Sequence, residues 1–323
     1  MRTENLFIKS NMIMNRFSWL LLLFLTIMAF ANSCDLYEQD SYEETYMVES
    51  YLDTGEPLTK VRLSTTSQAT STYRFEDLAV DSAGVQVHRI DGNGSILQTT
   101  RYHQPDTGSG GIYYPIPAEN QVAEPLAQFR LEITIPETGH EISAETAVPD
   151  AFSILESARD TLVYQSTEQL ETVISPIENP YQDQSHFIFT ILAENPQYEA
   201  LTPFYRDQVD DSDETTIEDF TINNSGIVNE GNFTLNNDGT ITLKLPWIGF
   251  AFYGPNKLVT STIDKNTYDF IRSQSVQTGG STLSPGEIQN AIYHVEGGIG
   301  IFGSISSDTI STFLVPPAFP EGS

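Results

Sequence analysis

A run of glycines near the C-terminus has residue types and spacing that could bind a phosphate. In HVEGGIGIFG (residues 294–303), Gly298, Gly300 and Gly303 have the G-x-G-x-x-G spacing of a dinucleotide-binding loop. Such a loop follows a strand, opens a helix, and needs an acidic residue about 20 positions later to hold the ribose. The residues after Gly303, SISSDTISTFLVPP, instead have the composition of a strand followed by prolines. The sequence therefore predicts no nucleotide site, and we expect no cofactor.

We expect the same glycines to shape a sheet. Gly297 and Gly298 permit a bulge or a close approach of another backbone, because glycine has no Cβ and tolerates a positive φ. Gly300 and Gly303 are expected to leave room for a large neighbour, such as an aromatic side chain from the segment around Trp247.

Metal-binding side chains do not form a recognisable motif. No two histidines have the i, i+2 or i, i+4 spacing of a zinc site; they are His88, His103, His140, His186 and His294. The acidic run DQVDDSDETTIED (residues 207–219) lacks the glycine turn and the ligand spacing of an EF-hand loop. We predict a solvated loop there and no metal site, with a calcium-binding loop as the alternative.

The sequence contains no recognisable catalytic signature. The chain has no G-x-S-x-G and no S-x-x-K motif, so no nucleophilic serine is indicated. A carboxylate pair for glycoside hydrolysis cannot be selected among 44 acidic residues. The sequence therefore predicts a protein that is not an enzyme, with an extracellular hydrolase as the less favoured alternative.

The single cysteine, Cys34, lies at the end of a targeting signal. Lys9 and Arg16 precede the apolar run FSWLLLLFLTIMAFA, which is too short to span a bilayer comfortably and ends at ANSC. This arrangement predicts a lipoprotein signal peptide over residues 1–33 and acylation of Cys34 with fatty acids such as palmitate. The alternative is a plain secretory signal with an incidental cysteine.

The net charge of the chain excludes some classes of binding partner. With 44 acidic and 15 basic side chains the formal net charge is −29 at pH 7. Such a surface repels phosphate backbones and anionic lipid, so nucleic-acid binding is not expected. Any membrane attachment would depend on the lipid at Cys34.

Aromatic side chains are the candidate contact surface for a ligand or partner. GGIYYP (residues 110–115) contains Tyr113 and Tyr114, and PWIGFAFYGP (residues 246–255) contains Trp247 and Tyr253. Because both faces of the second segment are apolar when it is read as a strand, burial in the core is the alternative.

Three hydroxyl residues match the acceptor pattern Asp-Ser/Thr-apolar for O-linked glycans in exported proteins. They are Ser82, Thr161 and Thr309. About two such tripeptides are expected by chance in so acidic a chain, so the pattern is a hypothesis for modification only.

The elements that must position these residues are mostly strands. Alternating apolar residues mark KVRLS (60–64), GVQVHRI (84–90), FRLEITI (129–135) and the hairpin FTLNNDGTITLKL (233–245). One helix is predicted near residues 264–276, because Asp264 can cap its first turn. This mostly β pattern predicts two tandem β-sandwich domains, immunoglobulin-like or carboxypeptidase-regulatory-like, with one short helix in the second.

The predicted domain organisation follows from breaks in this pattern. Residues 34–45 are acidic and aperiodic, which is typical of a tether. Pro149 interrupts the strand pattern, so we predict an N-terminal β-sandwich over residues 46–148 and a C-terminal β-rich domain over residues 149–323.

Four segments together resemble a known family. They are YMVESYLD (46–53), RDTLVY (159–164), DKNTYDFIRS (264–273) and VEGGIGIFGS (295–304). The chain resembles the DUF4249 family of Bacteroidota outer-membrane lipoproteins over essentially all of its length after the signal. These proteins are often encoded beside TonB-dependent transporters and have no established activity, so the resemblance implies no catalytic residue. By the same resemblance, the acidic residues after Cys34 are similar to signals for surface export.

These observations predict a lipid-anchored outer-membrane protein that faces the cell surface. We expect it to be a binding or accessory component associated with a TonB-dependent transport system. A structural or adhesive surface protein would share the same features and is the main alternative.

Overall fold

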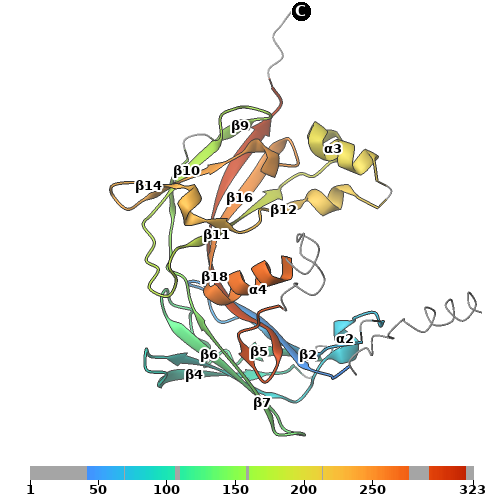
Figure 1. The fold of residues 1–323 in the computed structure, drawn as a ribbon, viewed down its shortest axis with the longest axis vertical. Coiled ribbons are helices and arrows are strands. Elements are labelled where there is room, and N and C mark those ends of the chain that lie inside the picture. The colour runs from blue at the N-terminus through green and yellow to red at the C-terminus, as the bar shows by residue number, and fades with distance from the viewer. Residues whose placement is uncertain are drawn as a thin grey trace, which may run out of the picture. The chain divides into compact units, whose positions relative to one another are not determined.

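The computed structural model describes residues 42–68, 70–105, 110–157, 160–212, 214–275 and 291–317 (Figure 1). The predicted signal peptide, Cys34 and most of the predicted tether lie outside the described residues. Residues Glu44–Ser323 form one compact unit. Its first half contains the strands β1 (Tyr46–Asp53), β2 (Val61–Thr65), β3 (Gly84–Ile90), β4 (Ile96–His103), β5 (Ile112–Pro115), β6 (Gln128–Ile135) and β7 (His140–Ala147).

The second half carries shorter strands and most of the helices. Its strands are β8 (Ile154–Ser157), β9 (Thr161–Val163), β10 (Leu170–Ile174), β11 (His186–Ala193), β12 (Ile222–Asn224), β13 (Val228–Asn229), β14 (Thr234–Leu235), β15 (Ile241–Leu245), β16 (Gly254–Ile263), β17 (Val295–Glu296) and β18 (Ile299–Val315). The described α-helices are α2 (Phe75–Leu78), α3 (Pro203–Asp210) and α4 (Lys265–Ser275), and the 3₁₀ helices are η1 (Tyr198–Ala200), η2 (Ile217–Phe220), η3 (Glu230–Asn232) and η4 (Trp247–Gly249).

The first hydrophobic core is enclosed by a sheet whose two ends both pair with the C-terminal segment, residues 295–315. β1 pairs with β18, and the order then runs β1-β2-β5-β4-β3-β6-β7-β17. Since β17 leads into β18 through Gly297 and Gly298, both ends of this path belong to one C-terminal segment. The alternation predicted for FRLEITI holds in β6, where every second side chain from Phe129 to Ile135 is buried.

The second core lies between two sheets. One contains β12, β11, β16 and the end of β18, and the other has the order β14-β15-β10-β8. Side chains of both sheets pack in one cluster, including Phe189 of β11 and Leu243 of β15. This is the two-sheet packing of a β-sandwich. The predicted hairpin over 233–245 is confirmed, because β14 pairs with β15 across a turn that contains Gly239 at positive φ.

One long strand is shared by the two cores. The first residues of β18 pair in parallel with β1, from Ile299 to Ile305. The rest of β18 pairs antiparallel with β16, up to Leu314. Phe302 is accordingly buried in the first core and Leu314 in the second. The predicted boundary at Pro149 lies where the chain passes from the first core to the second, yet β18 connects the two (Figure 1).

The prediction of a mostly β protein is confirmed, but the second half contains α3 as well as the one predicted helix. Helix α4 begins where Asp264 predicts it. Helix α3 was not predicted, and it occupies the start of the acidic run expected to be a loop over 207–219. Pro203 at its first turn has a φ suited to a helix, and Tyr205 is buried. The run ends in η2, whose first turn is closed by a capping box between Thr216 and Asp219.

Candidate binding site at the junction of the two cores

The four predicted contact aromatics do not form one surface. Tyr113 is only 1% exposed, and its hydroxyl donates to the carbonyl of Val80 (2.7 Å) and accepts from the N–H of Ala83 (3.0 Å). The prediction of a ligand contact at Tyr113 is therefore wrong, because its ring and its hydroxyl are both used inside the first core. Tyr114, the next residue of β5, alternates outward and is exposed.

Trp247 and Tyr253 belong to the second core. Both are half-buried and pack edge-on against Tyr164, with ring centroids 4.6 and 5.7 Å away. Trp247 starts the 3₁₀ helix η4 and is not in a strand, so the expected alternation of the segment fails after Pro246. These two side chains contribute mainly to packing.

The predicted glycan acceptors are all accessible. Ser82, Thr161 and Thr309 are exposed, in the loop before β3, in β9 and in β18 respectively. Within the described ranges, no group of three or more His, Cys, Asp or Glu side chains is placed to hold a metal ion. No described helix is long and apolar enough to cross a membrane.

The C-terminal glycines bring backbones together, as expected, but their neighbours differ from the prediction. Gly300 has φ +112°, and a Cβ there would overlap the carbonyl of Val48 in β1. A Cβ on Gly303 would overlap Thr267 Oγ1 and lie 3.3 Å from Asp264 Oδ1. The space at Gly303 therefore admits the start of helix α4, and the expectation of an aromatic neighbour is wrong.

Asp264 is the centre of the contact between α4 and the strands. It is 3% exposed, and four groups donate hydrogen bonds to its carboxylate. The N–H groups of Thr267 and Ser304 reach Oδ1 at 3.0 and 3.1 Å. The hydroxyl of Thr146 and the N–H of Asn266 reach Oδ2 at 2.7 and 3.3 Å. Burial raises the pKa of Asp264 above its ordinary value, and these donors oppose that rise.

Two neighbours extend this network. The amide of Asn266 donates to the carbonyls of Glu145 (2.6 Å) and Phe302 (2.9 Å), and Ser304 Oγ donates to the carbonyl of Ala147 (3.0 Å). The buried polar groups thereby connect β7, β18 and α4, at the place where the first core ends. These hydrogen bonds hold the start of α4 against β7 and β18.

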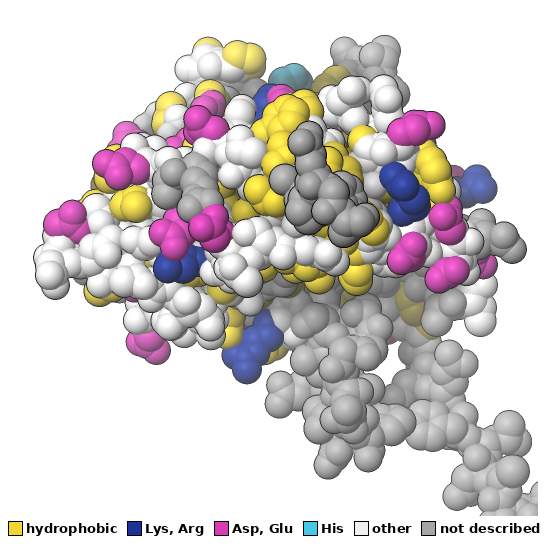
Figure 2. Space-filling view, turned by 90° about the horizontal axis from the view of Figure 1, so that it is seen from above, with side chains coloured by type: hydrophobic (Ala, Val, Ile, Leu, Met, Phe, Trp, Pro, Cys, Tyr) yellow, Lys and Arg dark blue, Asp and Glu magenta, His cyan; other side chains and the backbone are white. Residues whose placement is uncertain are grey.

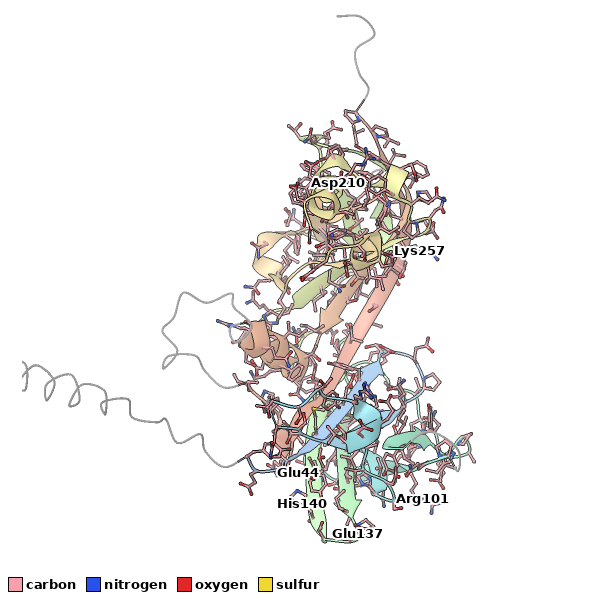
Figure 3. All side chains as sticks on the ribbon, turned by 90° about the vertical axis from the view of Figure 1, so that its right-hand side faces the viewer. Glu44, Arg101, Glu137, His140, Asp210 and Lys257 are labelled. Carbon is pink, nitrogen blue, oxygen red and sulfur yellow. The ribbon has the colours of Figure 1, made fainter. Side chains whose placement is uncertain are left out.

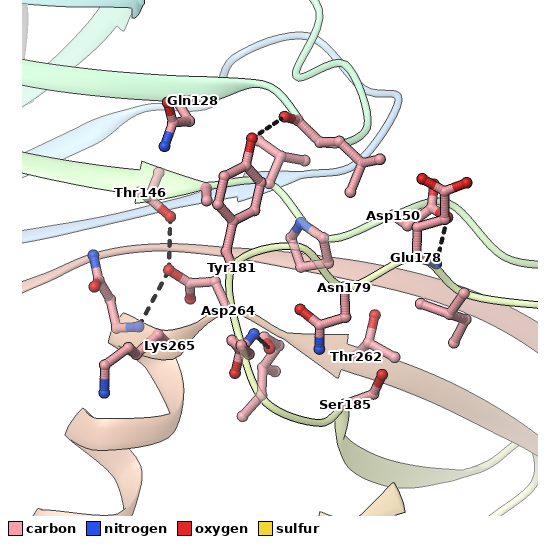
Figure 4. A pocket seen from close by; sticks show the side chains of 18 of the residues that line it. Gln128, Thr146, Asp150, Glu178, Asn179, Tyr181, Ser185, Thr262, Asp264 and Lys265 are labelled. Carbon is pink, nitrogen blue, oxygen red and sulfur yellow. Dashed lines mark hydrogen bonds between the residues drawn. The ribbon is translucent and has the colours of Figure 1, made fainter. Parts of the chain in front are cut away.

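A pocket of about 230 Å³ opens beside this network. Its walls come from the end of β7, the segment between β10 and β11, and the start of α4 (Figure 4). We call it the junction pocket; its lining consists of Leu126, Gln128, Glu145–Asp150, Ile177–Asn179, Tyr181, Gln182, Ser185 and Thr262–Asn266. These residues come from four separate stretches of the sequence, 126–128, 145–150, 177–185 and 262–266.

One wall of the junction pocket contains a strained residue. Leu126 has φ +60°, a conformation that costs a residue with a side chain roughly 1–3 kcal/mol. In this conformation its N–H donates to the carbonyl of Val148 (3.1 Å), and its own carbonyl accepts from the hydroxyl of Tyr181 (2.9 Å). The Tyr181 ring is therefore held in place at the pocket wall (Figure 4).

Several polar side chains of the pocket make no hydrogen bond of their own within the described part of the chain. Thr262 is 3% exposed, and its hydroxyl is buried without a partner. The hydroxyl of Ser185 and the amides of Gln128 and Asn179 are likewise not engaged. A buried hydroxyl without a partner costs about 1–3 kcal/mol, so a ligand that bonds it gains affinity.

Acidic groups surround the pocket, but most are already engaged. Glu145 pairs with Arg130 (2.7 Å), and Asp150 accepts from the N–H of Glu178 (2.9 Å). Lys265, the one basic side chain among the described lining residues, pairs with Asp269 outside the pocket (2.7 Å). The pocket therefore has a negative rim, and its uncharged lining is partly polar and partly apolar.

The sequence singles out two lining residues of this pocket, Pro149 and Asp264, but as a domain boundary and a helix cap. Tyr181, Asn179 and Thr262 lie in no motif, and no local pattern distinguishes them from other surface residues. The positive φ of Leu126 also has no sequence signal, since leucine rarely adopts it.

Comparison with known proteins identifies a family for this chain. A family described as "Domain of unknown function (DUF4249)" matches residues 33–311. No curated protein matches the chain.

Among solved structures, a DUF4785 family protein from Legionella pneumophila is 9% identical with a TM-score of 0.25, over 68% of this chain and 52% of that one. Trypsin-activated alpha-2-macroglobulin from Escherichia coli is 8% identical with a TM-score of 0.20, over 70% of this chain and 15% of that one. The chain thus spans a small part of the macroglobulin. At such TM-scores neither likeness carries an argument about activity.

Proposed function

The chain belongs to the DUF4249 family, and from this premise we propose that it is a lipid-anchored outer-membrane protein that binds a ligand without transforming it, as an accessory component beside a TonB-dependent transporter. The observation that carries the binding role is the junction pocket. Its interior offers polar groups without partners around a fixed aromatic ring, which is typical of a preformed ligand site.

The use of the buried carboxylate supports binding over catalysis. Asp264 accepts hydrogen bonds from four protein groups, so its lone pairs are engaged in holding α4. A general base needs a lone pair directed at the substrate proton, and a nucleophile needs access to the reacting atom. The most deeply buried acid of the pocket meets neither need and serves as a structural cap.

The strand arrangement suits a protein anchored through Cys34. Tyr46 begins β1 only 12 residues after Cys34, a stretch that reaches roughly 40 Å when fully extended. β1 runs parallel to the start of β18, and β18 continues to Val315, a length of roughly 50 Å from Ile299. Glu44 and Asp210 accordingly lie at opposite ends of the folded unit (Figure 3). The end of the folded unit that carries α3 is thus the one farther from Glu44.

That far end, which we call the α3 end, has the apolar character of a partner contact. Val163 of β9, Phe204 of α3 and Phe313 of β18 are each more than a third exposed. Figure 2, which looks down on the α3 end, shows hydrophobic side chains gathered in the middle of the face with acidic ones around them. Apolar side chains grouped in this way favour association with another protein.

Photo-crosslinking in the native outer membrane tests the accessory role. The full-length protein carrying Phe204→p-benzoylphenylalanine is irradiated in cells, and captured proteins are identified by mass spectrometry. We expect a TonB-dependent transporter to be captured, because Phe204 lies at the α3 end with its side chain 43% exposed.

The control places the same group at Leu97 of β4, which is 59% exposed in the first half. Capture of the transporter from position 204 but not from position 97 supports the proposal. Recovery of porins alone, or of the same proteins from both positions, contradicts it.

A further inference from the structure

We propose that the junction pocket binds one ring of an uncharged sugar. This inference rests on the proposed function, since it names the class of ligand that the pocket would take. It is derived from the size of the pocket, its charge, its unpaired hydrogen-bonding groups and its aromatic wall.

The size of the pocket limits the ligand to a single small ring. Pockets for drug-sized ligands measure roughly 300–1,000 Å³. The junction pocket, at about 230 Å³, is smaller. A single hexose fits this scale, and a longer saccharide would have to extend out of the pocket with its other rings.

The charge of the pocket disfavours ions of both signs. An anion would meet the rim of Glu145, Asp150 and Glu178, while Lys265 is already paired with Asp269. A metal cation needs several carboxylates that converge on it, and no group of three or more His, Cys, Asp or Glu side chains in the described residues is placed to hold one. Glu145 is bonded to Arg130, and Asp264 accepts four hydrogen bonds. An uncharged ligand avoids both penalties.

The unpaired groups match the hydrogen bonding of sugar hydroxyls. Each sugar hydroxyl donates one hydrogen bond and accepts others. The amide of Asn179 and the hydroxyls of Ser185 and Thr262 can likewise donate and accept. Figure 4 draws these three side chains together on the same side of Tyr181. Thr262 is the most informative of them, because its buried hydroxyl has no partner in the protein.

The Tyr181 ring supplies the apolar contact that a sugar ring needs. One face of a pyranose is lined with C–H groups, which pack against the negative face of an aromatic ring. Tyr181 is 42% exposed, so a ring face is open to a ligand. Its hydroxyl is bonded to the carbonyl of Leu126 at 2.9 Å, which fixes the ring before any ligand arrives. The strained φ of Leu126 directs that carbonyl, and we assign it this positioning role.

The inference is tested with four neutral sugars on the full-length protein in detergent. Glucose, galactose, mannose and N-acetylglucosamine are each titrated at millimolar concentrations, and binding is read by saturation-transfer-difference NMR. Glucuronate and choline serve as the anionic and cationic comparisons. We expect at least one neutral sugar to bind more tightly than either ion. The inference is overturned if none of the four neutral sugars binds, or if only choline or glucuronate binds.

Two variants locate the binding. Thr262→Val removes the unpaired hydroxyl while keeping the shape of the side chain, so the fold is maintained and the affinity falls about three- to tenfold. Tyr181→Ala removes the ring and lowers the affinity further. Tyr198→Ala is the matched control, because Tyr198 is also exposed with its hydroxyl bonded, at 2.7 Å to Asp210, but lies outside the pocket. Equal affinity for wild type and both pocket variants overturns the inference.

The outcome can be separated from that of the proposed accessory role. Transporter capture is read at Phe204, which does not line the junction pocket. If the ligand is of another class, capture persists while no sugar binds. If the accessory role is wrong, capture fails while sugar binding is unaffected.

Discussion

Gly303 of β18 lies directly against Thr267 of helix α4, so closely that any Cβ on the glycine would overlap the threonine hydroxyl. The glycine therefore allows Asp264 to cap α4 while the helix packs on the strand.

Gly303→Ala is expected to destabilise the protein. The added methyl group meets Thr267 Oγ1, and overpacking of this kind costs roughly 1–3 kcal/mol. The free energy of unfolding in urea measures the effect. Gly226→Ala is the control, because a Cβ there has no neighbour within 4 Å and φ is not positive. Adding Thr267→Ala to Gly303→Ala should restore part of the loss, and failure to do so would indicate that the clash lies elsewhere.

Asp264 is expected to give the stability of the protein a distinct dependence on pH. Its pKa is raised in the folded state by burial, so the folded protein holds the proton at pH values where the unfolded chain has lost it. The contribution of Asp264 to the free energy of unfolding is therefore fully present below its ordinary pKa of 3.8. This contribution declines as the pH rises from 3.8 through the raised pKa of the folded state.

The contribution of Asp264 is isolated by measuring the free energy of unfolding of wild type and Asp264→Asn across this pH range. Asparagine does not titrate, so the difference between the two proteins should shrink as the pH rises above 3.8. A difference that grows with pH would mean that the four donors outweigh burial and that the pKa of Asp264 is in fact lowered.

Tyr113→Phe is expected to cost about 1–3 kcal/mol of stability, because the N–H of Ala83 and the carbonyl of Val80 lose their partner inside the first core. Tyr114→Phe should leave stability unchanged, since that side chain is exposed. Thermal unfolding of the two variants makes the comparison. Equal effects would contradict the structural role assigned to Tyr113.

Cys34→Ala is expected to release the protein from the membrane. The acyl chains would be its attachment, because the acidic surface has no attraction for anionic lipid. Fractionation of cells that express wild type or the variant measures the change. Membrane retention of the variant after a high-salt wash would exclude the lipid as the main attachment.

Glycans at the predicted sites would raise the mass of the protein above that of its amino-acid sequence. All three acceptors are exposed, so intact mass spectrometry of the protein from its native host should show hexose-bearing species. Thr309→Ala should remove one glycan from that mass. Ser307→Ala is the control, because Ser307 is also exposed in β18 but follows serine and not aspartate. Identical masses for wild type and Thr309→Ala would exclude Thr309 as an acceptor.

Local features of the chain were sufficient to predict local structure. The alternation in residues 129–135, the turn in the hairpin over 233–245 and the cap at Asp264 each involve residues within a few positions of one another. Hydrogen bonds and side-chain directions at such short range follow from backbone geometry, so periodicity and capping residues reveal them. Helix α3 shows the limit, because its acidic composition hid the buried Tyr205 that stabilises it.

The tertiary structure alone decided which distant residues meet. The parallel pairing of Val48 with Gly300 joins positions 252 residues apart, and nothing in either strand specifies its partner. The same holds for Leu126, Tyr181 and Thr262, which line one pocket from three separate segments. Long-range contacts arise from the packing of whole sheets, which leaves no periodic trace in any one segment. The sequence thus determined the elements and the family, and the packing of those elements determined the site.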